Sequence, residues 1–256
     1  MKKKIMAAVI AATILLSACS NGKNENSRSG QDNGGETEKE TTESVKDTVT
    51  HSGKYVVFGR YEQDGNTGNG PEPIEWEILS EKDGKMLLVS RYILDFQPYN
   101  TTRTDVSWET CSLREWLNND FYFEAFSENE QAQIPTVTVP NPANAYYGTD
   151  CGNDTQDKVF CLNVQEIIDN YSFEEWDDEF LYGTSQAVLT GATKYAQTKH
   201  DYDNNGYFYW WLRSSGGHKD YVCCCDFYGR TGWTCIDRHV DSDGIGVRPA
   251  IYLSIQ

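Results

Sequence analysis

The feature that most constrains the fold is a change in composition near residue 52. Residues 20–52 contain no aromatic residue and only two valines, so this stretch cannot bury enough apolar surface to offset the entropy cost of folding. We therefore expect a flexible tether there and one folded domain over residues 53–256. Its 204 residues are a normal size for a single domain with its own core.

The N-terminus has the features of an export signal. Three lysines precede an apolar stretch from Ile5 to Leu16, which is too short for a permanent membrane span. The stretch ends in Leu16-Ser17-Ala18-Cys19, which resembles the lipobox of bacterial lipoproteins, where the cysteine becomes the lipidated N-terminus. We expect a signal peptide over 1–18, lipidation at Cys19 and a tether over 19–52, which would hold the domain at the extracellular face of the cell membrane. Ordinary secretion is the alternative.

The chain is strongly acidic. Its formal net charge is −17, and residues 53–256 contain no basic run. Nucleic acid is therefore not an expected partner, because nucleic-acid affinity depends largely on Lys and Arg. The lipid anchor, and not a basic surface, would supply the membrane contact.

Strand patterns occur at both ends of the domain. Ile74, Trp76 and Ile78 alternate with Glu75 and Glu77. This run belongs to three β-rich segments, 55–61, 73–81 and 85–94, and Lys82-Asp83-Gly84 suits a tight hairpin between the last two. Four more strand-like segments follow residue 206 and are separated by turns that contain glycine.

Short helices are expected between these strands. A serine or asparagine precedes a glutamate by three residues at three places, which is the spacing of a capping box: Ser112–Glu115, Ser127–Glu130 and Asn163–Glu166. Residues 184–199 form a further candidate helix, weakened by Gly191. Short helices within a β framework predict an α+β fold.

Several motifs resemble a known kind of domain. The segments "FGRYEQDG", "IEWEIL", "LREWLNNDFYFEAFS", "WWLRSS" (210–215) and "GVRPAIYL" (246–253) are similar to those of an uncharacterised family of bacterial surface and secreted proteins. That family resembles the C-type-lectin-like fold, and within it the sulfatase-modifying, formylglycine-generating group. The resemblance extends from about Lys54 to Leu253 and implies a C-type-lectin-like domain with antiparallel sheets and a few short helices.

The resemblance implies a ligand face between "WWLRSS" and "GVRPA". In lectin-like proteins diversified by retroelements, adenine-directed mutation of this segment varies the contact residues, and the codons involved do not encode Lys, Glu, Gln, Met or Trp. These five types make up 52 of 256 residues, yet residues 220–255 contain only Trp233. Strands avoid Lys and Glu in any case, so an ordinary static surface is the alternative.

Within this segment we expect about half of the side chains to reach solvent, because side chains alternate between the two faces of a strand. Tyrosine and arginine make productive contacts at interfaces. A protein is favoured over a sugar as the ligand, because lectin-type sugar recognition usually depends on a calcium site and on E-P-N or Q-P-D triplets, and the sequence contains neither triplet. The predicted ligand-binding residues are Tyr221, Cys223, Cys225, Asp226, Phe227, Tyr228, Arg230, Trp233, Asp237, Arg238, His239 and Asp241, with a core position as the alternative for Trp233. Arg213 and Arg248 are expected to be buried and paired with carboxylates.

The sequence contains possible metal ligands but no arrangement typical of a metal site. Cys223, Cys225, Cys235, His218 and His239 offer soft ligands, but no C-x2-C or H-x3-H spacing organises them, so no metal site is predicted. "DYDNNG" (201–206) matches the first half of an EF-hand loop through Asp201, Asp203 and Asn205. The twelfth position is Leu212, so a polar loop is expected and weak calcium binding is the alternative.

Neither the remaining cysteines nor any sequence motif nominates an active site. Seven cysteines follow Cys19, an odd number, and a Cys151–Cys161 disulfide is one possible loop closure. G-x-S-x-G, H-E-x-x-H and P-loop motifs are all missing from the sequence, and no two cysteines have the four-residue spacing of the sulfatase-modifying copper pair. We therefore predict a ligand-binding domain with no catalytic residues. An enzyme of the sulfatase-modifying type or a glycan-binding module are the alternatives.

Overall fold

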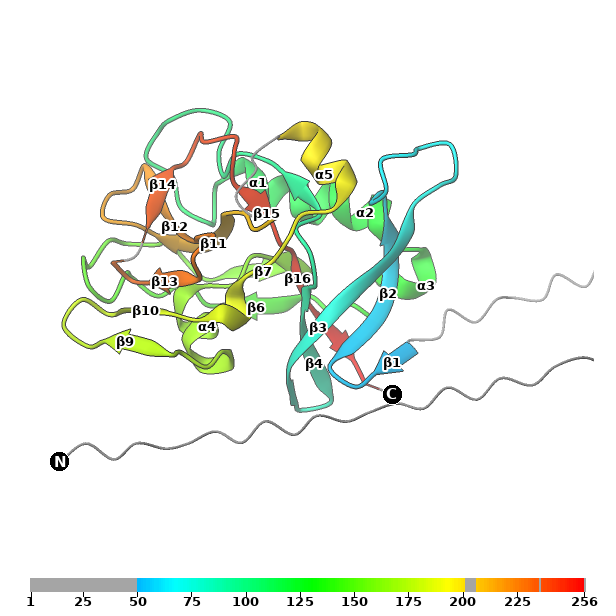
Figure 1. The fold of residues 1–256 in the computed structure, drawn as a ribbon, viewed down its shortest axis with the longest axis horizontal. Coiled ribbons are helices and arrows are strands. Elements are labelled where there is room, and N and C mark those ends of the chain that lie inside the picture. Colours follow the sequence, from blue (N-terminus) through cyan, green and yellow to red (C-terminus); the bar gives the residue numbers. More distant parts are fainter. Residues whose placement is uncertain (1–49, 201–205, 235, 256) are drawn as a thin grey trace, which may run out of the picture. The chain divides into compact units, whose positions relative to one another are not determined.

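Figure 1 shows the fold as a computed structural model, which describes residues 50–200, 206–234 and 236–255. These residues belong to the compact unit Val45–Gln256. The predicted signal peptide, Cys19 and the tether up to residue 49 lie outside the described residues. The last three residues assigned to the tether form strand β1 (Thr50–Ser52), so the folded domain starts slightly earlier than predicted.

The first of two large sheets has six antiparallel strands in the order β1-β2-β3-β4-β16-β8. The C-terminal strand β16 therefore lies beside β4, next to the N-terminal meander that the sequence predicted. The strands after β1 are β2 (Tyr55–Tyr61), β3 (Glu72–Lys82), β4 (Lys85–Ser90), β16 (Ala250–Ser254) and β8 (Val159–Phe160).

The β3–β4 hairpin confirms the predicted turn. Asp83 and Gly84 are its two central residues, and both have positive φ angles, 51° and 71°. Positive φ at both positions is the type I′ geometry that matches the twist of a two-residue hairpin, and Asp-Gly is one of its preferred pairs.

The second large sheet has the order β14-β12-β11-β15-β5. It contains most of the segment in which the ligand-binding residues were predicted. Its strands are β14 (Asp237–His239), β12 (Tyr221–Cys225), β11 (Trp210–Ser215), β15 (Gly246–Val247) and β5 (Asp95–Phe96). β11 and β15 pair in parallel, and the other neighbours are antiparallel.

Two small sheets complete the β framework. One is three-stranded, in the order β13-β10-β9, and the other is the two-stranded ribbon of β6 and β7. Their strands are β9 (Glu175–Asp177), β10 (Tyr182–Thr184), β13 (Arg230–Gly232), β6 (Val137–Val139) and β7 (Thr155–Asp157). Figure 1 shows β12, β13 and β14 at one end of the domain and β1 at the other.

Two of the three predicted capping boxes are present. Ser127 caps α3 (Glu128–Gln131) with Glu130, and Asn163 caps α4 (Val164–Asn170) with Glu166. The third prediction is wrong by one residue, because Cys111 and not Ser112 is the N-cap of α1 (Ser112–Trp116). The chain continues through a π-helical turn, η1 (Leu117–Phe121), into α2 (Tyr122–Ala125).

The candidate helix over residues 184–199 is two separate pieces. A 3₁₀ turn, η2 (Gln186–Val188), is followed by α5 (Lys194–Lys199). Gly191 lies in the break, where its carbonyl accepts a hydrogen bond from Ile93 N–H at 3.0 Å. The chain leaves the helix here because its backbone pairs with another segment.

Aromatic contacts connect the segment between β5 and β6 to both large sheets. The ring of Phe126 stacks on Trp76 of β3, and Tyr99 contacts both Trp108 and Trp211 of β11. Antiparallel sheets with a few short helices confirm the predicted α+β class. Among the described residues, no helix is both long enough and apolar enough to cross a membrane.

Candidate functional site

The three adjacent cysteines are interior residues, contrary to the prediction that alternate side chains of β12 reach solvent. Cys223, Cys224 and Cys225 are each at most 1% exposed. Cys223 Sγ lies 3.9 Å from the Asn144 amide on one side, and Cys225 lies beside Arg248 in the interior. Alternation predicts exposure only where one face of a sheet meets water, and β12 is covered on both faces. The expected exposure of Cys223 and Cys225 is therefore wrong, and the candidate surface leaves them out.

Asp226 and Trp233 are also interior. The Asp226 carboxylate accepts hydrogen bonds from the N–H groups of Tyr228 (2.9 Å) and Arg230 (2.8 Å), and from Arg230 Nε (2.7 Å). It thus fixes the turn between β12 and β13, where Gly229 has a φ of 78°. Trp233 is 4% exposed and packs in the core, which was its alternative assignment. Both side chains are therefore buried where exposure was expected, and the candidate surface leaves them out.

A continuous row of aromatic and arginine side chains includes the turn held by Asp226. The Arg238 guanidinium lies 4.5 Å from the ring centroid of Tyr209, and the Tyr209 and Phe227 rings are 5.0 Å apart and perpendicular. Phe227 contacts Tyr228 at 4.3 Å, and Arg230 lies 5.1 Å from the Tyr228 ring. We call these five residues the aromatic–arginine band. Tyr228, which lies between Phe227 and Arg230, is 59% exposed.

A hollow of about 590 Å³ lies at the Arg230 end of the band. We call it the tyrosine hollow; it is lined by Tyr146, Tyr147, Phe180, Tyr182, Arg230, Thr234 and Ile236. Tyr146, Tyr147 and Phe180 are 43%, 49% and 43% exposed. Exposed aromatic rings gathered at one place are typical of a recognition surface.

Buried polar groups hold the rings of the tyrosine hollow in place. Asn144 is 1% exposed, and its side-chain oxygen accepts from Tyr146 N–H (2.9 Å) and Tyr147 N–H (3.0 Å). Its amide donates to the carbonyls of Ser215 (2.9 Å) and Trp233 (3.0 Å). The Tyr146–Tyr147 loop is therefore fastened to the same part of the chain that carries the aromatic–arginine band.

A second hollow, of about 490 Å³, lies at the Arg238 end of the band. Its lining residues are His200, Phe208, Tyr209, Phe227, Arg238, Ser242, Asp243, Gly244 and Ile245. Three residues of the band thus line this hollow and Arg230 lines the other. The band and the two hollows form one face, which we call the aromatic face.

The other predicted contact residues lie on β12, on the edge strand β14 and in the turn after it. Tyr221 OH and His239 Nε2 are 3.1 Å apart, and both side chains are partly buried. Asp237 accepts a hydrogen bond from Gly217 N–H at 2.9 Å, so it fixes a loop. Asp241 is exposed but lines neither hollow.

Sequence reasoning missed several residues of the aromatic face. Tyr209 directly precedes "WWLRSS", and Phe180 belongs to an acidic loop. Tyr146 and Tyr147 lie in the Asn- and Gly-rich stretch 141–157, where two adjacent tyrosines were the one available signal. The fold, and not sequence proximity, brings these residues to the band.

Arg213 and Arg248 have the structural role that was predicted. Arg213 forms a two-pronged pair with Glu166, at 2.6 and 2.9 Å, and also donates to the Cys161 carbonyl at 2.7 Å. Arg248 pairs with Glu77 at 2.9 Å, so Glu77 is buried although the alternation of its strand placed it outside. Both arginines are at most 2% exposed.

Cys151 and Cys161 do not form the disulfide considered from the sequence. Both thiols are free and buried, and Cys151 Sγ accepts a hydrogen bond from Ser215 N–H at 3.3 Å. Burial raises the pKa of the nearby Cys111 thiol to about 12, and burial also raises the pKa of Cys161. Neither Cys111 nor Cys161 is therefore activated as a thiolate nucleophile at neutral pH.

This state of the thiols predicts their reactivity. In the folded protein at pH 8, iodoacetamide should leave Cys111 and Cys161 unmodified, because both are buried and protonated. In 8 M urea both should be alkylated within minutes, since an unfolded thiol has an ordinary pKa of about 8.5. Peptide mass spectrometry measures the two extents; rapid alkylation of the native protein would show that these thiols are accessible.

The calcium alternative rested on Asp201, Asp203 and Asn205, which lie outside the described residues, as does Cys235. Within the described ranges, the carboxylates of Glu62, Asp64 and Glu72 approach within 4.8 Å of one another. Glu72 accepts from two backbone N–H groups and Asp64 from Asn66 N–H. These two carboxylates thus accept hydrogen bonds from the backbone of the loop between β2 and β3 and stabilise it.

Comparison with known proteins gives one match. Residues 83–255 match the family model DUF6273, described as a domain of unknown function. The chain belongs to this family. The match covers β4 to β16 and includes every residue of the aromatic face, so the face lies within the family's domain. No curated protein and no solved structure matches this DUF6273 chain.

Proposed function

We propose that this DUF6273 domain is a C-type-lectin-like recognition module, held at the cell surface by a lipid on Cys19, that binds an extracellular protein through its aromatic face. The observation that carries the proposal is the run of contacts from Arg238 to Arg230 with a hollow at each end. Tyrosine and arginine are enriched among the residues that dominate binding energy at protein interfaces.

The chemistry of the face indicates what kind of protein surface fits it. Arg230 and Arg238 stand at opposite ends of the band, and aromatic rings fill the space between them. A ligand with an apolar centre flanked by carboxylates would match this order, because arginine pairs well with carboxylates. The position of β1 supports the same proposal, since the tether would join the domain at the end opposite β12, β13 and β14 (Figure 1).

Retroelement diversification remains part of this proposal, restricted to the residues of the segment that reach the surface. Tyr228, Arg238 and His239 could vary without loss of the core, whereas Cys223 and Cys225 are interior and could not. A near-copy of the coding segment that differs only opposite adenines, beside a reverse transcriptase gene, is the expected sign. If the gene neighbourhood lacks such a copy, the face is a static one.

A glycan is the second candidate ligand. Three exposed rings in the tyrosine hollow, beside Arg230 and Thr234, offer stacking surfaces and hydrogen-bond donors for sugar rings. The alternative of a sulfatase-modifying enzyme, which would use reactive thiols, has less support, because burial raises the pKa of the Cys111 and Cys161 thiols.

A capture experiment with matched variants tests the proposal. The full-length protein is immobilised and exposed to extracellular and surface proteins of cells that share its habitat, and bound proteins are quantified by mass spectrometry. We expect a protein that binds the wild type and Phe123→Ala equally but is lost with the double variant Phe180→Ala/Tyr228→Ala. Phe123, on α2, is 64% exposed and lies outside the aromatic face, so it is the matched control. Equal capture by all three forms would refute the proposal.

A further inference from the structure

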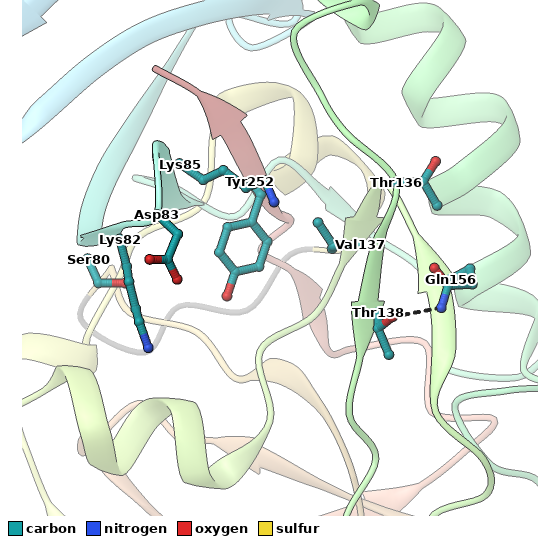
Figure 2. A pocket seen from close by; sticks show the side chains of 9 residues that line it. All are labelled: Ser80, Lys82, Asp83, Lys85, Thr136, Val137, Thr138, Gln156 and Tyr252. Atoms are coloured by element: carbon teal, nitrogen blue, oxygen red, sulfur yellow. Dashed lines mark hydrogen bonds between the residues drawn. The ribbon is translucent and has the colours of Figure 1, made fainter. Parts of the chain in front are cut away.

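A third hollow, of about 450 Å³, lies over elements that take no part in the aromatic face. It is formed by the tip of the β3–β4 hairpin, the β6–β7 ribbon and Tyr252 of β16 (Figure 2). Eight of its nine lining residues are polar or charged: Ser80, Lys82, Asp83, Lys85, Thr136, Thr138, Gln156 and Tyr252, with Val137 as the ninth.

Two lysines give this hollow its charge. Among the described residues, neither Lys82 nor Lys85 forms an ion pair, whereas Lys54, Lys199 and Lys219 each pair with a carboxylate. Asp83 is the one acidic residue in the lining, so the lining carries a net positive charge within a chain of formal charge −17. Such a local reversal of charge favours an anion.

The register of the hairpin supports the same conclusion. Lys82 and Lys85 are direct cross-strand partners, on either side of the Asp83-Gly84 turn. Like charges placed directly opposite each other destabilise an antiparallel pair. An anion bound near this pair would reduce the repulsion, so ligand binding would offset the cost of the pairing.

The rest of the lining suits a sugar. The Tyr252 ring lies between Asp83 of the hairpin and Val137 of β6, and its hydroxyl is directed into the hollow (Figure 2). Phe160 supports this ring at a centroid distance of 5.9 Å. Ser80, Thr136 and Thr138 add hydroxyl groups, and Gln156 donates to Thr138 Oγ1 at 2.8 Å, which fixes both side chains.

We propose that this hollow binds an anionic saccharide, with Lys82 and Lys85 supplying the positive charge that attracts the acidic group, the Tyr252 ring against the sugar and the threonine hydroxyls on the sugar hydroxyls. The acidic group can be a carboxylate, as in a uronic acid, or a phosphate, as in a sugar phosphate. The proposal does not rest on the function of the aromatic face, because the two sets of lining residues do not overlap.

Titration of the full-length protein tests the proposal with three probes: a trigalacturonate, a phosphorylated disaccharide and the neutral maltotriose. Calorimetry at low salt should show binding of one or both anionic saccharides and at least about tenfold weaker binding of maltotriose. The preferred probe identifies the acidic group. The absence of binding by both anionic probes at 10 mM, or equal binding of maltotriose, would overturn the proposal.

Variants assign the binding to this hollow. Lys82→Gln/Lys85→Gln should weaken binding by about tenfold or more, while Lys194→Gln, which removes an exposed lysine of α5, should leave it unchanged. The double variant should melt at or above the temperature of the wild type, because it removes the repulsion between the two lysines. Undiminished binding by the double variant would place the ligand elsewhere and overturn the proposal.

Discussion

Replacement of Arg248 by methionine should lower the free energy of unfolding by about 3–5 kcal/mol, because it leaves a buried carboxylate without its main partner. Arg248 is 2% exposed, pairs with Glu77 at 2.9 Å and donates to the Ser90 carbonyl at 2.7 Å. Lys54 also contacts Glu77, at 2.5 Å, but its side chain is 56% exposed and cannot reproduce these interior contacts. Urea denaturation followed by tryptophan fluorescence measures the loss.

Arg91 provides the matched control for this substitution. It pairs with Glu75 in the same sheet at 2.8 Å, but the two side chains are 39% and 42% exposed. Because water screens such a pair, Arg91→Met should cost less than about 1 kcal/mol. An equal loss in the two variants would show that the buried pair does not hold β3 against the C-terminal segment.

The second large effect concerns binding. For a protein ligand captured by the wild type, Tyr228→Ala and Phe180→Ala should each raise the dissociation constant by about 30-fold, the effect of removing an aromatic hot spot worth about 2 kcal/mol. The melting temperature should change little, because the two side chains are 59% and 43% exposed. Calorimetry or surface plasmon resonance gives the affinities.

Phe123→Ala is the control for these two variants. The Phe123 ring is 64% exposed, more than Tyr228 or Phe180, and it lies on α2, outside the aromatic face. The Phe123→Ala variant should bind the protein ligand with the same dissociation constant as the wild type. If Tyr228→Ala and Phe180→Ala bind as well as Phe123→Ala does, the aromatic face does not contact the ligand.

The sequence predicted the parts of the fold that local patterns determine. The Asp83-Gly84 turn is correct because type I′ geometry requires particular residues at its two central positions. The caps at Ser127 and Asn163 are correct because a capping box is complete within four residues. The prediction that Arg213 is buried and paired also holds, but its partner, Glu166, is 47 residues away and could not be named from the sequence.

The candidate site was harder to predict because it depends on which face of each strand is covered. The run 223–226 reads as a half-exposed strand, but it lies in a sheet with cover on both faces. Conversely, Tyr146 and Phe180 come from loops that reach the face only through the folded backbone. Of the twelve predicted contact residues, Phe227, Tyr228, Arg230 and Arg238 belong to the aromatic–arginine band, and the turn held by Asp226 carries the first three.

Hydroxyl-radical footprinting of the full-length protein, with and without its captured ligand, tests the central claim most directly. If the aromatic face is the binding surface, oxidation of Tyr146, Phe180 and Tyr228 should fall on ligand binding while oxidation of Phe123 stays constant, because only covered rings are protected. Protection of Phe123 with unchanged oxidation of Tyr146, Phe180 and Tyr228 would contradict the account and place the ligand on a different face of the domain.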